Sequence, residues 1–181
     1  STATTAAPAT NALKPGDELA SIKFSHIDGD RPDDMKIVLM DNKDTVNKRK
    51  STDSNIVHTM ARNKGNGTIE LNPEQFFEHY NNVSSGKSGW NKSKDKKAKA
   101  LVEEISKSPE EMLTWTILHE RGHDTIDGHN PKLSYSGKGG QEAAANNWAY
   151  DKFFDKASPD YIEAKKAATE ILKNIDPNNT L

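Results

Sequence analysis

The pattern His-Glu-x-x-His, in the stretch LHERGH at residues 118–123, constrains this chain more than any other feature of its sequence. On a helix, residues four apart lie on the same face, so His119 and His123 can direct both imidazole rings at one metal ion. Glu120 lies one position further round, where its carboxylate reaches a metal-bound water and not the metal. A metal ion lowers the pKa of such a water toward neutrality, and the glutamate can take its proton. The pattern therefore predicts a helix that carries two metal ligands and a general base.

The residues before this motif predict the helix that carries it. Ser108 is a suitable N-cap, Pro109 fits the first helical position, and Glu111 falls where a capping box has its carboxylate. Apolar residues then continue up to the motif: Met112, Trp115, Ile117 and Leu118. In a chain with six histidines, the motif would arise by chance roughly once in a hundred cases. The helical context therefore favours a metal site over the alternative, two surface histidines on an amphipathic helix.

A zinc site that activates water needs a third protein ligand and one open position. Two downstream residues are candidates for that ligand. His129 follows His123 by six residues, and Glu142 opens an alanine-rich helix that we expect at residues 141–155. The spacing alone leaves the choice between them open.

The stretch EAAANNWA at residues 142–149 resembles the E-x-x-A-[DN]-x-x-A motif of the gluzincins, in particular the compact zincin metallopeptidases with a minimal catalytic core. This resemblance implies that Glu142 is the third zinc ligand and that Asn146 supports a zinc-binding histidine. It also implies that Ala145 and Ala149 let the two helices pack closely. Asparagine stands where aspartate is commoner in the family. The resemblance therefore implies a somewhat less basic histidine, because an amide oxygen accepts the imidazole N–H without a charge.

His119, His123 and His129 also match the spacing of another zincin branch, the metzincins, whose motif is H-E-x-x-H-x-x-G-x-x-H. That motif has a glycine where this chain has Ile126, and a β-branched residue is poorly suited to a positive φ. Metzincins also have a methionine turn downstream of the third histidine. All four methionines of this chain lie upstream: Met35, Met40, Met60 and Met112. We therefore expect Glu142, and not His129, to be the third ligand.

The resemblance to gluzincins implies two further parts of an active site. These enzymes often steady the oxyanion with a tyrosine or histidine, and Tyr135, His129 and Tyr150 are near the site in sequence. Tyr135 belongs to a glycine-rich loop that can move over a cleft, so we take Tyr135 as the candidate and expect Tyr150 in the core. The family also has an antiparallel edge strand beside the cleft. The stretch GTIELNP at residues 67–73 looks like that strand and its exit turn, so we expect Thr68–Leu71 to have one unpaired side for an extended peptide.

Hydrophobic patterning predicts the rest of the fold. We expect strands at residues 22–27, 35–40, 68–71 and, more weakly, 55–62, and helices from residues 73 and 109 and around residues 92–105, 141–155 and 160–173. Residues 1–20 are expected to be a flexible segment and residues 21–181 a single domain. The expected fold class is α+β and zincin-like. A small mixed sheet with an antiparallel edge strand packs on the active-site helix, and a mostly helical lower half follows.

Composition removes several classes of function. The chain has 181 residues and no cysteine, which excludes disulfides, thiolate zinc fingers and a cysteine nucleophile. A net charge of -2 gives no electrostatic case for nucleic acid, and no apolar run approaches the roughly 18 residues of a membrane span. Five lysines at residues 92–99 are expected on a solvated helix face, the alternative being a basic patch for an acidic partner. The first residues, STATTAAPATN, lack the features of an intact signal peptide, and nothing in the sequence fixes a compartment.

Together, the motifs and the resemblance predict a zinc-dependent peptidase that acts as a monomer on a protein or peptide. Zn2+ is expected on His119, His123 and Glu142, with Glu120 as general base and Tyr135 as the oxyanion group. One alternative is a non-catalytic module that uses the zincin scaffold to bind a protein partner, although such a module does not need Glu120. Another is a peptidase with one dedicated target, such as a secreted toxin, an effector or a virion component.

Overall fold

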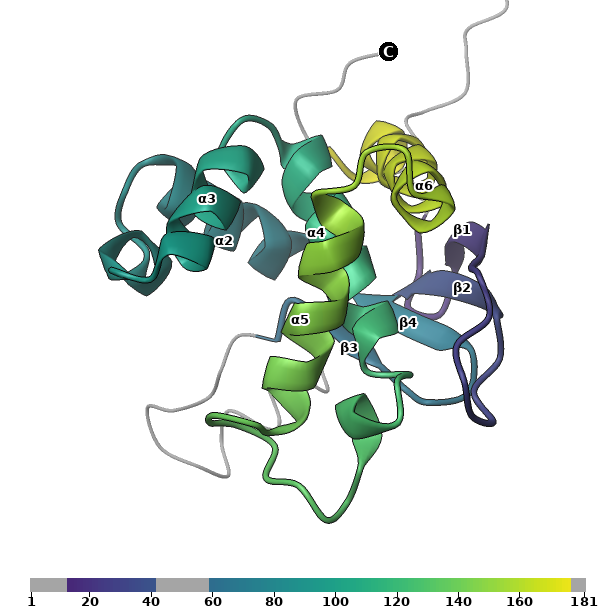
Figure 1. Cartoon of the computed structure of the whole chain (residues 1–181). Helices are drawn as coiled ribbons and strands as arrows, with labels where there is room; N and C mark the ends of the chain where they lie inside the picture. Colours follow the sequence, from purple (N-terminus) through teal and green to yellow (C-terminus); the bar gives the residue numbers. More distant parts are fainter. Residues whose placement is uncertain (1–12, 42–58, 177–181) are drawn as a thin grey trace, which may run out of the picture.

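The computed structural model describes residues 13–41 and 59–176, and these ranges form a mixed α+β fold (Figure 1). The strands are β1 (Glu18–Lys23), β2 (Asp34–Leu39), β3 (Ala61–Asn63) and β4 (Thr68–Leu71). The helices are α2 (Pro73–Ser84), α3 (Lys96–Ile105), α4 (Pro109–Gly122), α5 (Gln141–Phe153) and α6 (Pro159–Ile175), with two short 3-10 helices, η2 (Gly89–Lys92) and η3 (Asp127–His129). A small sheet therefore precedes a mostly helical second half, as the sequence predicts.

The sheet has the strand order β1-β2-β4-β3, with β2 and β4 parallel and the two outer pairs antiparallel. β4 is paired on both sides, so the prediction that Thr68–Leu71 is an edge strand with one free side is wrong. The alternation in TIEL distinguishes the two faces of a strand and carries no information about its edges. Among the described strands, β1 and β3 form the edges. Of the weak strand prediction at residues 55–62, residues 55–58 lie outside the described ranges, and β3 begins at Ala61.

The first strand begins four residues earlier than the predicted strand at residues 22–27. β1 begins at Glu18, inside the segment at residues 1–20 that was expected to be flexible. Leu19 and Ala20 are both buried, and the pairing with β2 is irregular between Glu18 and Ala20, as at a β-bulge. Two consecutive core residues interrupt the alternation by which a strand is recognised in a sequence, which explains the misplaced boundary.

α4 begins where the sequence predicts, but its cap differs in one respect. The Ser108 side chain accepts a hydrogen bond from the backbone N–H of Glu111 at 3.1 Å, and Pro109 occupies the first turn. The Glu111 carboxylate turns away from this cap, so the predicted capping box is wrong. It accepts hydrogen bonds from the Tyr161 hydroxyl and the Lys165 ammonium group of α6. Partners on α6 thus take the Glu111 carboxylate that a capping box would use, while the Ser108 cap remains, and Glu111 ties α4 to α6.

α4 is the central helix of the molecule. Figure 1 shows α5 lying across it, with α2 and α3 to one side and the sheet and α6 to the other. Ten of its fourteen residues are buried. Because neighbours enclose the helix on several sides, the side chains of its last turn have few positions open to them.

Candidate metal centre

Two closely crossing helices carry the candidate site. The motif at residues 119–123 forms the last turn and the C-cap of α4, and Glu142 lies in the first turn of α5. At the crossing, a Cβ atom on Gly122 would lie only 2.5 Å from the backbone oxygen of Ala145. Ala145 and Ala149 are fully buried, as expected of the small residues in the second motif. The absence of a side chain at Gly122 therefore allows α5 to bring Glu142 to the histidines.

His119, His123 and Glu142 form a group that could hold a metal ion, because their ligand atoms lie within 4.8 Å of one another. Oε1 of Glu142 lies 2.7 Å from Nε2 of His123 and 3.4 Å from Nε2 of His119. The three side chains are between 12% and 31% exposed, so solvent reaches the group. Among the described residues, His129 does not belong to it. Nδ1 of His129 lies instead 3.0 Å from the backbone oxygen of His123.

The second ring nitrogen of each histidine fixes the orientation of its ring. Nδ1 of His119 lies 2.7 Å from Oδ1 of Asn146, the interaction that the sequence motif predicts. Nδ1 of His123 lies 2.7 Å from the backbone oxygen of Gly128. Both partners are acceptors, so each Nδ1 carries a proton. In a neutral ring, each Nε2 therefore presents its lone pair to the point that the group surrounds.

The charges within the group favour a cation at its centre. Burial alone would raise the pKa of Glu142, but hydrogen bonds from His119 and His123 outweigh burial and hold that pKa well below its usual range. Burial alone would lower the pKa of both histidines, but hydrogen bonding to Glu142 raises the pKa of each ring above its ordinary value. A bound metal ion would take the place of the Nε2 protons and supply the positive charge that balances the Glu142 carboxylate.

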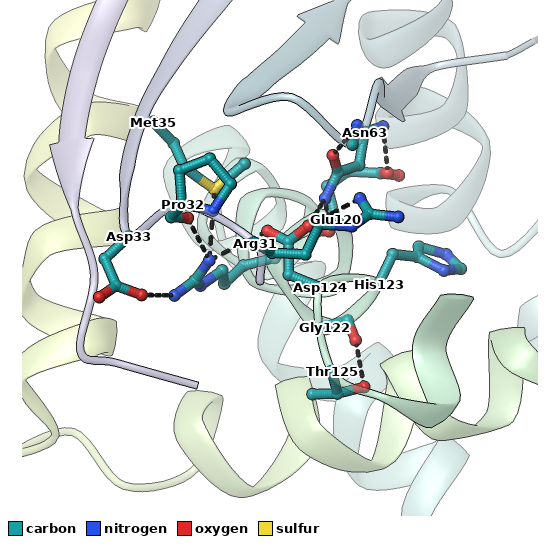
Figure 2. A network of polar contacts seen from close by, with 12 residues as sticks. Arg31, Pro32, Asp33, Met35, Asn63, Glu120, Gly122, His123, Asp124 and Thr125 are labelled. Atoms are coloured by element: carbon teal, nitrogen blue, oxygen red, sulfur yellow. Dashed lines mark hydrogen bonds and ion pairs between the residues drawn. The ribbon is translucent and has the colours of Figure 1, made fainter. Parts of the chain in front are cut away.

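Glu120 lies beside the group and is held by the edge strand β3. Its side chain is largely buried, and burial raises the pKa of its carboxyl. Oε2 of Glu120 accepts a hydrogen bond from the backbone N–H of Asn63 at 2.9 Å, and the Glu120 backbone oxygen accepts one from Asn63 Nδ2 at 2.8 Å (Figure 2). Oε1 has no hydrogen-bond partner among the described residues. The strand therefore fixes one oxygen of the carboxylate and leaves the other available.

Tyr135 lies against the group from the loop that precedes α5. Its ring is parallel to the His123 ring, with centroids 6.0 Å apart, and its backbone oxygen accepts a hydrogen bond from the Glu142 N–H at 2.9 Å. Tyr135 is 63% exposed as a whole, but desolvation of its phenol and the adjacent Glu142 carboxylate raise the pKa of that phenol, so its hydroxyl stays protonated. Tyr150, which was expected in the core, is half-buried and also lines the cleft described next.

A cleft of about 860 Å³ opens at the group and continues between α2, η2, α3 and α4. Its walls beyond the group are largely aromatic and aliphatic, and include His79, Trp90, Leu101, Val102 and Trp115. Leu101 and Val102 are only half-buried because they face this cleft. The five lysines are all exposed, as both the predicted solvated helix face and its alternative, a basic patch, require.

Three polar residues in or beside the motif were not predicted from the sequence. Arg121 and Asp124 are fully buried, although charged residues beside a motif are usually exposed. Asn63, which bonds to Glu120, begins the stretch NKGNG at residues 63–67. No signal in the sequence distinguishes these three from ordinary surface residues, because several of their contacts, such as Arg121 with Asp33 and Asn63 with Glu120, join residues far apart in the chain.

No family model matches this chain, and neither a curated protein nor a solved structure matches it. Within the described ranges, no helix has the length and apolar character needed to cross a membrane. The function of the protein is therefore inferred from the geometry of the site.

Proposed function

We propose that the protein is a zinc-dependent peptidase whose zinc ion is held by His119, His123 and Glu142. The observation that carries this proposal is the convergence of two imidazole Nε2 atoms and one carboxylate on a single point, with Glu120 beside them. Two histidines and a glutamate, with a fourth position open, form a donor set that suits catalytic zinc. The hydrogen bonds at both Nδ1 atoms support the same assignment, because zinc-binding histidines are usually oriented in this way.

Glu120 acts as the general base of the reaction. A zinc ion in this site would supply a Lewis acid that acidifies water and polarises the scissile carbonyl. The Glu120 carboxylate takes a proton from the attacking water and later gives it to the leaving amine. Because Asn63 holds Oε2, the proton is taken by Oε1. Burial raises the pKa of Glu120 above its ordinary value, which makes its carboxylate a stronger base.

Tyr135 acts as the oxyanion group. Its protonated hydroxyl lies beside the Glu142 carboxylate, at the edge of the metal group, where a donor can reach a developing negative charge. His129 is less suited to this role because its ring is engaged with the His123 backbone.

The substrate is an extended segment of peptide that lies in the cleft and pairs with β3. The backbone oxygen of Met60 accepts from the N–H of Asn72, and the backbone N–H of Lys64 donates to Thr68, so both residues face β4. Residues of an antiparallel pair face the partner strand alternately, so the backbone groups of Ala61 and Asn63 point away from β4. The outward N–H of Asn63 donates to Glu120, and Ala61 lines the cleft. Ala61 is therefore the residue at which a peptide strand would add to the sheet.

The substitution Glu120→Gln tests the proposal. The amide fills the same volume but cannot take a proton, so we expect zinc binding within about twofold of the parent and cleavage at least about 100-fold slower. Elemental analysis measures the zinc, and digestion of a peptide library measures cleavage. The exposed Glu103 of α3 supplies the matched control, Glu103→Gln, which should change neither.

Two outcomes would contradict the proposal in different ways. Cleavage by the Glu120→Gln variant at the parent rate would remove Glu120 from the mechanism. A parent protein that holds zinc but cleaves no peptide would instead favour a non-catalytic binding module.

A further inference from the structure

A buried network of polar side chains joins α4 to the segment between β1 and β2 (Figure 2). Its centre is the fully buried guanidinium group of Arg121. This group donates to the backbone oxygens of Ser25 and Pro32 and to the carboxylates of Asp33 and Asp124, at 2.8 to 3.0 Å. Four acceptors, two of them charged, offset the loss of hydration of the arginine. The segment is therefore fixed against the helix that carries the motif.

Asp124 extends this network from Arg121 to the edge of the sheet. Its side chain is 1% exposed, and Oδ2 accepts the hydrogen bond from Arg121 at 3.0 Å. Oδ1 accepts hydrogen bonds from Arg31 at 3.2 Å and from Nδ2 of Asn63 at 2.8 Å. A buried carboxylate with a donor on each oxygen has little freedom to turn. Asp124 therefore gives Asn63 a fixed partner.

Asn63 is the last residue of β3, and all polar atoms of its side chain are engaged. Nδ2 donates to Asp124 and to the backbone oxygen of Glu120, both at 2.8 Å, and Oδ1 accepts the N–H of Gly65 at 2.8 Å. The backbone N–H of Asn63 donates to Oε2 of Glu120 at 2.9 Å. The Asn63 side chain thus fixes β3 to α4 at Asn63 itself, whose backbone N–H donates to the Glu120 carboxylate.

We infer that Asn63 is a positioning residue of the peptidase. Asp124 anchors the Asn63 side chain, which directs the backbone N–H of Asn63 at Oε2 of Glu120. The Glu120 carboxylate is thereby turned so that Oε1 faces the attacking water. This inference rests on the proposed function. A carboxylate that is free to rotate spends part of its time in unproductive orientations, and a displacement of about 1 Å in an active site can lower a rate by about 100-fold. A residue with a merely structural role would instead change stability, zinc binding and turnover together.

The variants Asn63→Ala and Asn63→Ser test the inference. Alanine removes all side-chain bonds, whereas serine removes both Nδ2 bonds but keeps an acceptor for the Gly65 N–H. The control is Arg62→Gln, on the same strand, which removes the ion pair with Glu70 and leaves Asn63 in place. For each protein, kcat and KM on a cleaved peptide, zinc affinity by competition with a chelator, and the midpoint of thermal unfolding are measured.

We expect kcat to fall about 10- to 100-fold in both Asn63 variants, with KM and zinc affinity within about twofold of the parent. The Arg62→Gln variant should keep the parent kcat. If Asn63→Ala does not fold, Asn63→Ser decides the test. An unchanged kcat, or a loss of zinc affinity as large as the loss of kcat, would overturn the inference.

A parent protein that hydrolyses no peptide would refute the proposed function but would still leave Asn63 open to test. In that case, crystal structures of the parent and of Asn63→Ser decide. The Glu120 carboxylate should be rotated or displaced in the variant. A carboxylate in the same position in both structures would overturn the inference.

Discussion

The side chains of Glu142 and His129 have different partners, although both residues follow the motif closely in sequence. The Glu142 carboxylate faces Nε2 of both motif histidines, whereas the His129 ring is bound to the His123 backbone. Glu142→Ala should therefore lower zinc affinity by at least about 100-fold, and His129→Ala by less than about threefold. Competition with a chelator of known affinity measures both. The reverse result would make His129, and not Glu142, the third ligand.

Asn146 should affect the zinc affinity of the same site without being a metal ligand. Its Oδ1 lies 2.7 Å from Nδ1 of His119, and loss of such a partner typically lowers metal affinity by about 10- to 100-fold. We expect this loss for Asn146→Ala. Asn146→Asp should bind zinc at least as tightly as the parent, because a carboxylate accepts the same N–H with a full charge. Asn147→Ala is the control on the neighbouring exposed residue, and an equal loss in both alanine variants would contradict the role of Asn146.

The crossing of α4 and α5 depends on one glycine. A Cβ atom on Gly122 would lie 2.5 Å from the backbone oxygen and 2.8 Å from the Cα atom of Ala145, and neither can move without moving α5. Gly122→Ala should therefore cost about 1 to 3 kcal/mol in the free energy of unfolding, and should weaken zinc binding because Glu142 moves with α5. At Gly89 a Cβ would meet nothing within 4 Å, so Gly89→Ala is the control. Chemical denaturation measures both variants, and equal stabilities would refute the close crossing.

Elements with local signals were predictable from the sequence. Ser108 caps α4 as expected, α2 begins at the predicted residue, Pro73, and β4 has its predicted bounds, Thr68–Leu71. The neighbours of a strand depend on residues far away along the chain, so the edge position was wrongly given to β4. The capping pattern at the start of α4 likewise carries no information about the bonds from Glu111 to α6.

The residues of the candidate site were likewise predictable from the sequence only where the signal is local. Two short motifs indicated His119, His123 and Glu142, which the fold brings together. Asn63 and Arg121 were not predictable, because their partners are distant. The bond from Asn63 to Glu120 spans 57 residues, and the bond from Arg121 to Ser25 spans 96.

For the molecule as a whole, Glu111 links stability to pH by holding α6 on α4. Burial alone would raise the pKa of this carboxyl, but Lys165, Lys156 and Tyr161 outweigh burial and lower the pKa below its ordinary value of 4.5. A carboxyl whose pKa is lower in the folded state stabilises the fold above its unfolded-state pKa, and this contribution is lost as the pH falls through the folded-state value. Glu111→Gln should therefore lower the midpoint of thermal unfolding at neutral pH. It should also flatten the decline of that midpoint as the pH falls below about 4.5, the ordinary pKa of the carboxyl.

The control for this effect is Glu103→Gln, which removes an exposed carboxyl from α3. Its unfolding midpoint should follow that of the parent at every pH. The same pH dependence in both variants would mean that Glu111 does not link α6 to pH.

One zinc ion, held by His119, His123 and Glu142, is proposed to make this protein a peptidase. The most direct measurement is the rate at which chelator-treated protein cleaves a peptide library as zinc is added back. We predict no cleavage before the addition and a rate that rises until about one zinc per chain is bound. Cleavage that survives removal of the metal, or none at any zinc concentration while the protein stays folded, would contradict the claim.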